Sequence, residues 1–277
     1  MNDFRYERRY RGKLKGVILD WAGTTVDYGC MAPAAVFVEV FERQGVPITM
    51  EEAREPMGLH KKDHIRIVSK LSSVSKRWQE KHGKPCSEAD VETMFDDFIP
   101  RQLACIAKHA DIIPGTLDTV KSFRKRGLKI GSSTGYNREM MNILMPEARA
   151  GGYEADCVVC ASEVPQGRPS PWMVFENAKQ LGIYPMEAIV KIGDTVSDIA
   201  EGLNAGNWTI GVAVAGNEMG LPENEIAKLE AGERKSRIAR AYERLLTAGA
   251  HFVVDSIADV EPCLDEIERR LASGERP

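Results

Sequence analysis

Short apolar runs recur along the chain, and segments with a helical spacing of apolar positions separate them. The runs cover residues 16–19, 128–132, 157–160, 189–192, 209–214 and 251–254. Continuous apolar runs are typical of strands buried on both faces, and strands that alternate with helices indicate a parallel sheet. The pattern predicts an α/β protein with a Rossmann-like, doubly wound parallel sheet covered by helices on both faces.

The strand pattern disappears between Gly29 and about His109, where amphipathic helical spacing replaces it. Two helix starts in this stretch have the spacing of capping boxes, Thr49-x-x-Glu52 and Ser87-x-x-Asp90. Because this stretch follows the first strand directly, we expect a helical cap domain inserted into a discontinuous sheet domain. The expected domains are residues 1–28 and 110–277 for the core and residues 29–109 for the cap.

Composition and charge narrow the class of protein. The 277 residues are 43% hydrophobic, and no stretch approaches the roughly 20 apolar residues that a bilayer crossing requires. The first thirteen residues are basic without a following apolar segment, so we interpret them as a solvated tail and expect a cytoplasmic protein. A net charge of only −4 favours a small-molecule substrate over nucleic acid or a membrane surface.

Six cysteines in a chain of this length are too sparse for a disulfide framework. Cys157 and Cys160 form a C-x-x-C pair, but they lie in a predicted strand, where residues three apart point to opposite faces. No second pair completes a zinc site, so we expect neither a zinc nor a redox role for these two residues.

Polar side chains follow the apolar runs, where the carboxyl ends of parallel strands form the ligand-binding edge of a doubly wound sheet. They are Asp20, Ser133, Thr134, Glu163 and Asp194. Arg168 comes just before a predicted helix, and Asp198 places a second acid four residues after Asp194. Each alone could be an ordinary turn or cap residue. Together, these carboxylates, hydroxyls and the arginine suit a divalent cation and a phosphoryl group.

The run Asp20-Trp21-Ala22-Gly23-Thr24-Thr25-Val26-Asp27 resembles the nucleophile motif of the haloacid dehalogenase superfamily. Thr134, Arg168 and the segment from Asp194 to Asp198 resemble its later three motifs, in order. The resemblance implies that Asp20 attacks phosphorus and that Thr134 and Arg168 hold the phosphoryl oxygens. It also implies Mg²⁺ bound by Asp20, the Ala22 carbonyl and Asp194, with Asp198 in the shell around the metal.

One position separates the subfamilies of this superfamily. Its phosphatases and mutases usually have a second aspartate two residues after the nucleophile, where this chain has Ala22. The runs 20–29, 56–61 and 134–136 closely resemble the phosphonoacetaldehyde hydrolases. This resemblance implies a hydrolase of phosphonate degradation, which cleaves the carbon–phosphorus bond of phosphonoacetaldehyde through a lysine Schiff base and an aspartyl phosphate. The products would be acetaldehyde and phosphate.

A carbon leaving group requires an electron sink, and an amine supplies one by condensing with the aldehyde to a protonated imine. The resemblance points to Lys61 as this amine. Taken alone, Lys61 would be interpreted as a solvated helix start, because charged residues surround it. A free lysine has a pKa of about 10.4, so we expect closure of the cap to desolvate Lys61 and lower its pKa.

Several other residues are expected to line the substrate site. His64 follows Lys61 by three residues and could either relay protons or serve in packing. Met57 and Cys30 match family positions near the lysine, although the small, apolar side chain of Cys30 is more typical of a buried filler than of direct chemistry. No firm role is expected for Glu163. The expected substrate-binding set is Thr134, Arg168, Tyr136, Met57, His64 and Cys30.

Three alternative functions fit the sequence less well. A phosphate-ester phosphatase would lack the acid for its leaving oxygen at Ala22. A dehalogenase works without magnesium, whereas Asp194 and Asp198 suit a cation. A non-catalytic ligand-binding protein with this fold would have no reason to retain the nucleophile together with Lys61 and Arg168.

Residues 34–41 are apolar around more than one face of a predicted cap helix. A helix on a protein surface needs only one apolar stripe to pack against its core. The surplus favours a homodimer formed through the cap domains, which the family resemblance also implies.

Overall fold

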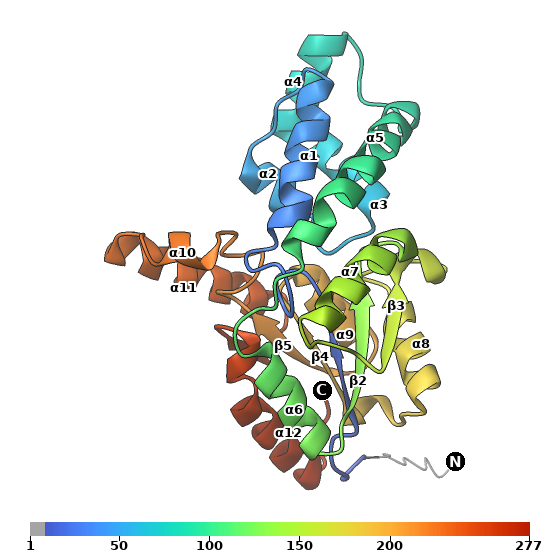
Figure 1. The fold of residues 1–277 in the computed structure, drawn as a ribbon, viewed down its shortest axis with the longest axis vertical. Coiled ribbons are helices and arrows are strands. Elements are labelled where there is room, and N and C mark those ends of the chain that lie inside the picture. Colours follow the sequence, from blue (N-terminus) through green and yellow to red (C-terminus); the bar gives the residue numbers. More distant parts are fainter. Residues whose placement is uncertain (1–8) are drawn as a thin grey trace, which may run out of the picture.

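The computed structural model describes residues 9–277 and has a parallel sheet with a bundle of helices beyond one of its edges (Figure 1). Six strands form the sheet, in the order β3-β2-β1-β4-β5-β6, and every pair is parallel. The strands are β1 (Gly16–Leu19), β2 (Lys129–Thr134), β3 (Cys157–Cys160), β4 (Ile189–Gly193), β5 (Trp208–Val212) and β6 (Phe252–Val254). The predicted doubly wound sheet is therefore confirmed, although β2 extends two residues further than its apolar run.

The register of the central strands aligns their carboxyl ends. Leu19, the last residue of β1, lies opposite Ser132 of β2 and Ile192 of β4. The next main-chain N–H, that of Asp20, donates to the Ile192 carbonyl over 2.9 Å. Polar residues that follow these strands in the sequence therefore emerge at one level of the sheet.

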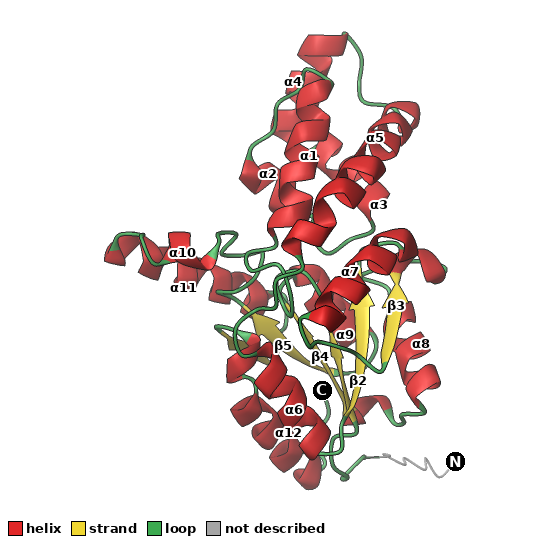
Figure 2. Ribbon diagram, in the orientation of Figure 1, coloured by secondary structure: helices red, strands yellow, loops and turns green. Residues whose placement is uncertain are grey.

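Helices cover both faces of the sheet (Figure 2), and the central strands are therefore buried on both sides. Val17 and Leu19 of β1 pack on the side of α6, α7 and α12, whereas Ile18 packs on the side of α8. The helix α9 contacts β4 and β5, and α11 contacts β5 and β6. The core helices are α6 (Thr116–Lys125), α7 (Arg138–Ala150), α8 (Trp172–Leu181), α9 (Val196–Asn204), α10 (Glu223–Ile226), α11 (Ala231–Thr247) and α12 (Glu261–Ser273).

Between β1 and α6 the chain builds five helices, which we call the helical unit. They are α1 (Met31–Arg43), α2 (Met50–Arg54), α3 (Lys61–Lys70), α4 (Ser72–His82) and α5 (Glu88–Ile106). The capping boxes expected before α2 and α5 are both present. Figure 1 shows the unit above the carboxyl ends of the strands, with α1 and α5 side by side. Phe37 of α1 stacks on Phe98 of α5 at a centroid distance of 4.5 Å.

The apolar surplus of α1 is used inside the helical unit. Seven residues of this helix are buried, and Ala35 is the exposed one among the small apolar positions. Helices α2 and α5 both pack against α1 and cover more than one of its faces. The two-sided apolar pattern of residues 34–41 is therefore explained by packing within one chain, and the sequence argument for a dimer loses this support.

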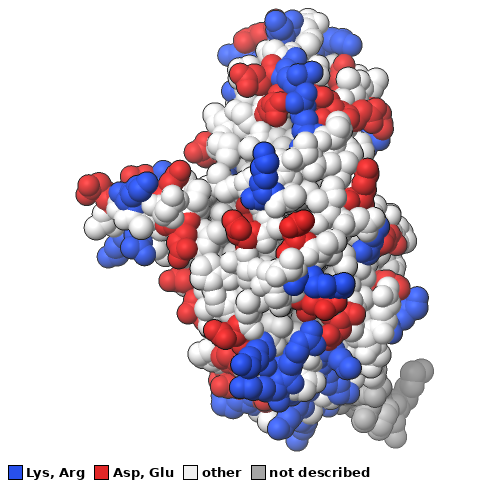
Figure 3. Space-filling view, in the orientation of Figure 1, with Lys and Arg blue, Asp and Glu red and all other residues white. Residues whose placement is uncertain are grey.

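The remaining expectations concern cysteines, charge and membranes. All six cysteines are free, and Cys157 and Cys160 belong to different apolar clusters, as expected for opposite faces of β3. Acidic and basic side chains are mixed on the face shown in Figure 3, with Lys and Arg gathered over α6 and α12. In residues 9–277 no helix is long and apolar enough to cross a membrane. The first eight residues of the basic tail lie outside the described residues.

Candidate active site

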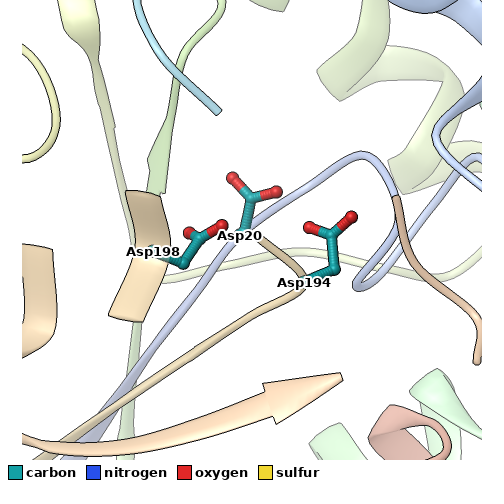
Figure 4. A group of neighbouring side chains, drawn as sticks. All are labelled: Asp20, Asp194 and Asp198. Atoms are coloured by element: carbon teal, nitrogen blue, oxygen red, sulfur yellow. The ribbon is translucent and has the colours of Figure 1, made fainter. Parts of the chain in front are cut away.

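Three aspartates meet at the carboxyl edge of the sheet. Asp20 directly follows β1, Asp194 directly follows β4, and Asp198 lies in the first turn of α9 (Figure 4). One carboxylate oxygen of each lies within 4.8 Å of the others, and all three residues are buried. Gly23 leaves room for the Asp194 carboxylate, because a Cβ atom at position 23 would lie 2.1 Å from Asp194 Oδ2. We call these three residues the acidic cluster.

Arg168 is buried against the acidic cluster and pairs with carboxylates on two sides. Its Nη2 lies 2.6 Å from Asp20 Oδ1 and 3.0 Å from Asp198 Oδ1. Its Nε donates to Glu201 Oε2 over 3.0 Å, and Nη2 also donates to the Ser133 carbonyl over 2.7 Å. With both edges of the guanidinium bonded, the orientation of Arg168 is fixed.

The sequence pattern did not identify two charged members of this site, Lys191 and Glu201. Lys191 Nζ lies 2.6 Å from Asp198 Oδ1 and 3.6 Å from Glu201 Oε2, and both side chains are 0% exposed. Glu201 also accepts a hydrogen bond from the Ser133 hydroxyl over 2.8 Å. The sequence did contain one signal, since Lys191 lies inside the apolar run 189–192. A strand buried on both faces accommodates a cation only when a carboxylate pairs with it, so this lysine indicates a buried acidic partner.

The charges of this network do not balance. Arg168 and Lys191 face four carboxylates, those of the acidic cluster and Glu201, which leaves a formal charge of −2. Burial and the neighbouring carboxylates of Asp20 and Asp198 hold the pKa of Asp194 well above its usual value. Burial also raises the pKa of Asp20, despite the opposing effect of Arg168. A divalent cation, which prefers carboxylate oxygens, would neutralise this excess.

The hydrogen bonds distinguish the three acids as possible metal ligands. Asp198 uses Oδ1 for Lys191 and Arg168, and its Oδ2 accepts from the Thr195 hydroxyl over 2.5 Å. Burial acts to raise the pKa of Asp198, but Arg168 and Lys191 outweigh it and lower the value. Asp20 and Asp194 are thus better placed to bind a cation directly, while Asp198 orients the groups around them. These residues fit a divalent metal.

A small pocket lies between the acidic cluster and the helical unit. Residues of the sheet domain and of the helical unit both line it. They include most of the site residues that the sequence predicts. The lining residues are Asp20, Ala22, Cys30, Pro33, Met57, Gly58, Lys61, Thr134, Gly135, Tyr136, Arg168 and Thr195. Asp194 and Asp198 are not in this lining and lie behind Asp20 in the buried network.

Lys61 begins α3 and is only 4% exposed, in contrast to the solvated helix start that its sequence context suggests. Its Nζ lies 4.8 Å from the ring centroid of Tyr136 and 5.7 Å from that of Phe37. Burial lowers the pKa of Lys61 to about 8, although the nearby Cys30 and Asp20 favour the charged form. At this pKa roughly 10% of the amine is neutral at pH 7, against less than ~0.1% for an exposed lysine.

His64 and Glu163 lie outside the lining of the pocket. His64 Nε2 lies 2.8 Å from the Ala53 carbonyl, so it donates there, and the ring stacks on Phe37 at 3.6 Å. Burial and the charge of Lys61 hold the pKa of His64 well below its usual value. Glu163 pairs with Arg138 at 2.7 Å and accepts from the Cys160 main-chain N–H. Glu163 thus stabilises the loop after β3, and His64 supports the helix that carries Lys61.

The loop before α3 rests directly on the core. A Cβ atom at Gly135 would lie 2.8 Å from the Leu59 carbonyl oxygen, so only glycine allows this approach. The Ser197 hydroxyl donates to the Met57 carbonyl over 3.1 Å. These contacts hold the helical unit against the core, so that the amine of Lys61 and the carboxylate of Asp20 line the same pocket.

Comparisons with known proteins find similar sequences and a similar fold. A family model described as haloacid dehalogenase-like hydrolase matches residues 14–206. Two curated relatives from Syntrophobacter fumaroxidans, a phosphonoacetaldehyde hydrolase and a phosphonoacetaldehyde hydrolase-like protein, are each 50% identical over all 277 residues and are covered over 100% of their length. A solved phosphonoacetaldehyde hydrolase-like protein from Oleispira antarctica has a TM-score of 0.95, with 38% identity and full coverage of both chains.

Proposed function

Since this chain belongs to the phosphonoacetaldehyde hydrolase family of haloacid dehalogenase-like hydrolases, we propose that it hydrolyses phosphonoacetaldehyde to acetaldehyde and phosphate. The observation that carries the proposal is the pocket that Asp20 and Lys61 share. A carboxylate that attacks phosphorus and an amine that condenses with an aldehyde are the two nucleophiles that this substrate requires.

Lys61 acts first in the proposed mechanism. Its neutral amine adds to the aldehyde carbon. The former aldehyde oxygen takes up one proton from the amine and one from solvent and leaves as water, and a protonated imine remains. The lowered pKa supports this role, because only the free amine can add to a carbonyl. Residues 29–109 act as a cap domain, whose helices keep bulk water away from Lys61 and from the imine.

Asp20 then attacks phosphorus. The carbon–phosphorus bond breaks, its electron pair moves into the imine to give an enamine, and the phosphoryl group is transferred to the Asp20 carboxylate. Arg168 and Thr134, which line the pocket beside Asp20, stabilise the phosphoryl oxygens. The enamine is protonated on carbon and hydrolysed to acetaldehyde, which frees Lys61. Water finally cleaves the aspartyl phosphate.

We assign Mg²⁺ to Asp20, Asp194 and the carbonyl of Ala22, with Asp198 in the surrounding shell. The charge deficit of the network supports this assignment. When bound, the metal neutralises the phosphonate and the attacking carboxylate. Met57, Tyr136 and Cys30 border Lys61 and contribute a dry wall, while His64 acts on the substrate only through the position of α3.

The pocket argues against a phosphate-ester phosphatase. Among the described residues that line it, Asp20 is the one carboxylic acid, and Ala22 occupies the place of a leaving-group acid. A non-catalytic binding protein would gain nothing from a buried lysine, which costs free energy unless its altered pKa is used. The six free cysteines agree with the reducing cytoplasm that we propose as its location.

The Schiff base predicts a covalent adduct on one lysine. With substrate and borohydride, Lys61 should be reduced to a stable secondary amine, which peptide mass spectrometry locates. In Lys61→Arg the guanidinium keeps the charge but forms no imine, so trapping should vanish and turnover should fall by several orders of magnitude. The neighbouring Lys62→Arg, which alters an exposed partner of Glu92, serves as the matched control. Turnover of Lys61→Arg above a tenth of the wild-type rate would eliminate the imine from the mechanism.

The pH profile should report the pKa of Lys61. Because burial lowers this pKa to about 8, the neutral amine increases about tenfold per pH unit below that value and levels off above it. We expect kcat/KM for phosphate release to rise with this slope from pH 6 to about 8. A profile that is flat between pH 6 and 8 would show that an amine with a lowered pKa does not control the reaction.

Asp20 and the metal should be required for cleavage of the carbon–phosphorus bond but not for formation of the imine on Lys61. In Asp20→Asn, phosphate release should fall at least a thousandfold, with an unchanged circular dichroism spectrum and continued trapping of Lys61. Excess chelator should abolish turnover of the wild type, and Mg²⁺ should restore it. Glu163→Gln, an acid at the edge of the sheet but outside the pocket, is the control and should keep its activity. Full turnover in chelator would contradict the metal assignment.

We also propose a homodimer formed through the cap. Phe95, Ile99 and Leu103 are spaced by four along α5 and remain partly exposed. Figure 3 shows a largely uncharged surface over the lower parts of α1 and α5. Light scattering of the wild type should give a mass of two chains. The Ile99→Glu variant should give the mass of one chain. A monomeric mass for the wild type at every micromolar concentration would refute the dimer.

A further inference from the structure

Arg54, the last residue of α2, lies where the helical unit meets the core. Its Nη1 donates to the carbonyls of Gly29 and Cys30, over 2.8 and 3.2 Å. The same nitrogen donates to Oδ1 of Asn217 over 3.1 Å. Arg54 therefore joins three separate segments: its own helix, the stretch where the chain enters the helical unit, and the loop after β5.

Asn217 continues this connection toward the acidic cluster. Its main-chain N–H donates to Asp194 Oδ2 over 2.7 Å, while its side-chain amide donates to the Arg54 carbonyl over 3.4 Å. Asn217 is buried, so neither contact is easily replaced by water. One residue thus contacts the helical unit through its side chain and a proposed metal ligand through its backbone.

The loop that carries Asn217 fits closely on both sides. A Cβ atom at Gly216 would lie 2.3 Å from Asp194 Cβ, and one at Gly220 would lie 2.8 Å from Arg54 Nε. There is little space for the loop to shift without moving one neighbour or the other. A displacement of α2 away from the core would break the bonds of Arg54, whereas the Asn217 N–H would still bond Asp194 and Glu218 would still pair with Arg244.

We propose that Arg54 and Asn217 are positioning residues that couple the closed arrangement of the cap to the placement of Asp194. The proposal rests on the proposed function, since it concerns the same site. With the cap closed, Arg54 fixes Asn217 and the Asn217 N–H fixes one oxygen of Asp194, which leaves the carboxylate oriented for a cation. Because such coupling is reciprocal, a cation on Asp194 also favours the closed cap.

The chain offers a neighbouring contact as a control. Glu55 follows Arg54 directly and also joins the helical unit to the core, through an ion pair with Arg244 at 3.0 Å. It is half exposed, and its ion pair with Arg244 involves neither Asn217 nor Asp194. Glu55→Gln therefore weakens a bond between cap and core and removes no hydrogen bond of Arg54 or Asn217.

Titration calorimetry with Mg²⁺ and no substrate tests the proposal independently of the reaction. Arg54→Lys and Asn217→Ala should each weaken Mg²⁺ binding about fivefold or more. The double variant should bind Mg²⁺ no more weakly than the weaker-binding single variant, because both substitutions break the same connection between Arg54 and Asn217. Glu55→Gln should bind Mg²⁺ as the wild type does. Asn217→Ser replaces the alanine variant if that one fails to fold.

Hydrogen exchange supplies the reciprocal readout. Mg²⁺ should slow exchange in residues 50–60 of the wild type, and this protection should be lost in Asn217→Ala. Additive losses of Mg²⁺ affinity, an equal loss in Glu55→Gln, or unchanged affinity in the single variants would overturn the coupling. None of these results depends on which substrate the enzyme cleaves, so the proposed function could fail while the coupling stands, and the reverse.

Discussion

A buried excess of negative charge at the carboxyl edge of the sheet is the constraint on which the rest of the structure depends. Charged groups can be buried only when they are paired, and Arg168 and Lys191 pair with only part of the four carboxylates around them. The glycines beside Asp194 and Asp198, at positions 23 and 193, are required because any side chain there would displace these acids. The uncompensated negative charge thus makes the edge of the sheet suitable for a divalent cation, and through that cation for an anionic substrate.

The helical unit uses the same low-dielectric environment for a different purpose. It buries Lys61, whose pKa falls to about 8, and it supplies part of the wall of the pocket that Lys61 shares with Asp20. Lys61 and Asp20, the two nucleophiles that we propose, therefore belong to different parts of the chain. Chemistry that requires both can proceed only when these parts are in contact, which gives the bonds of Arg54 and Asn217 their importance.

The sequence predicted the sheet and the acids at its edge because both depend on local pattern. Apolar runs mark buried strands, and Asp20 and Asp194 directly follow them. Lys61 could be nominated only through family resemblance, since its burial depends on a helical unit folding over a distant edge. Lys191 and Glu201 were missed for the same reason, because a charged side chain is normally exposed and its partners are far away in the sequence. The apolar faces of α1 suggested a dimer, whereas they pack within the chain.

The free energy of unfolding, measured in Mg²⁺ and in potassium chloride of equal ionic strength without substrate, tests the charge imbalance most directly. If the buried network lacks two positive charges, Mg²⁺ should stabilise the wild type increasingly with the logarithm of its concentration, and potassium should not. Asp194→Asn removes one of the uncompensated carboxylates and should lose this response. Equal stabilisation of the variant and the wild type by Mg²⁺, or no stabilisation of either, would contradict the account.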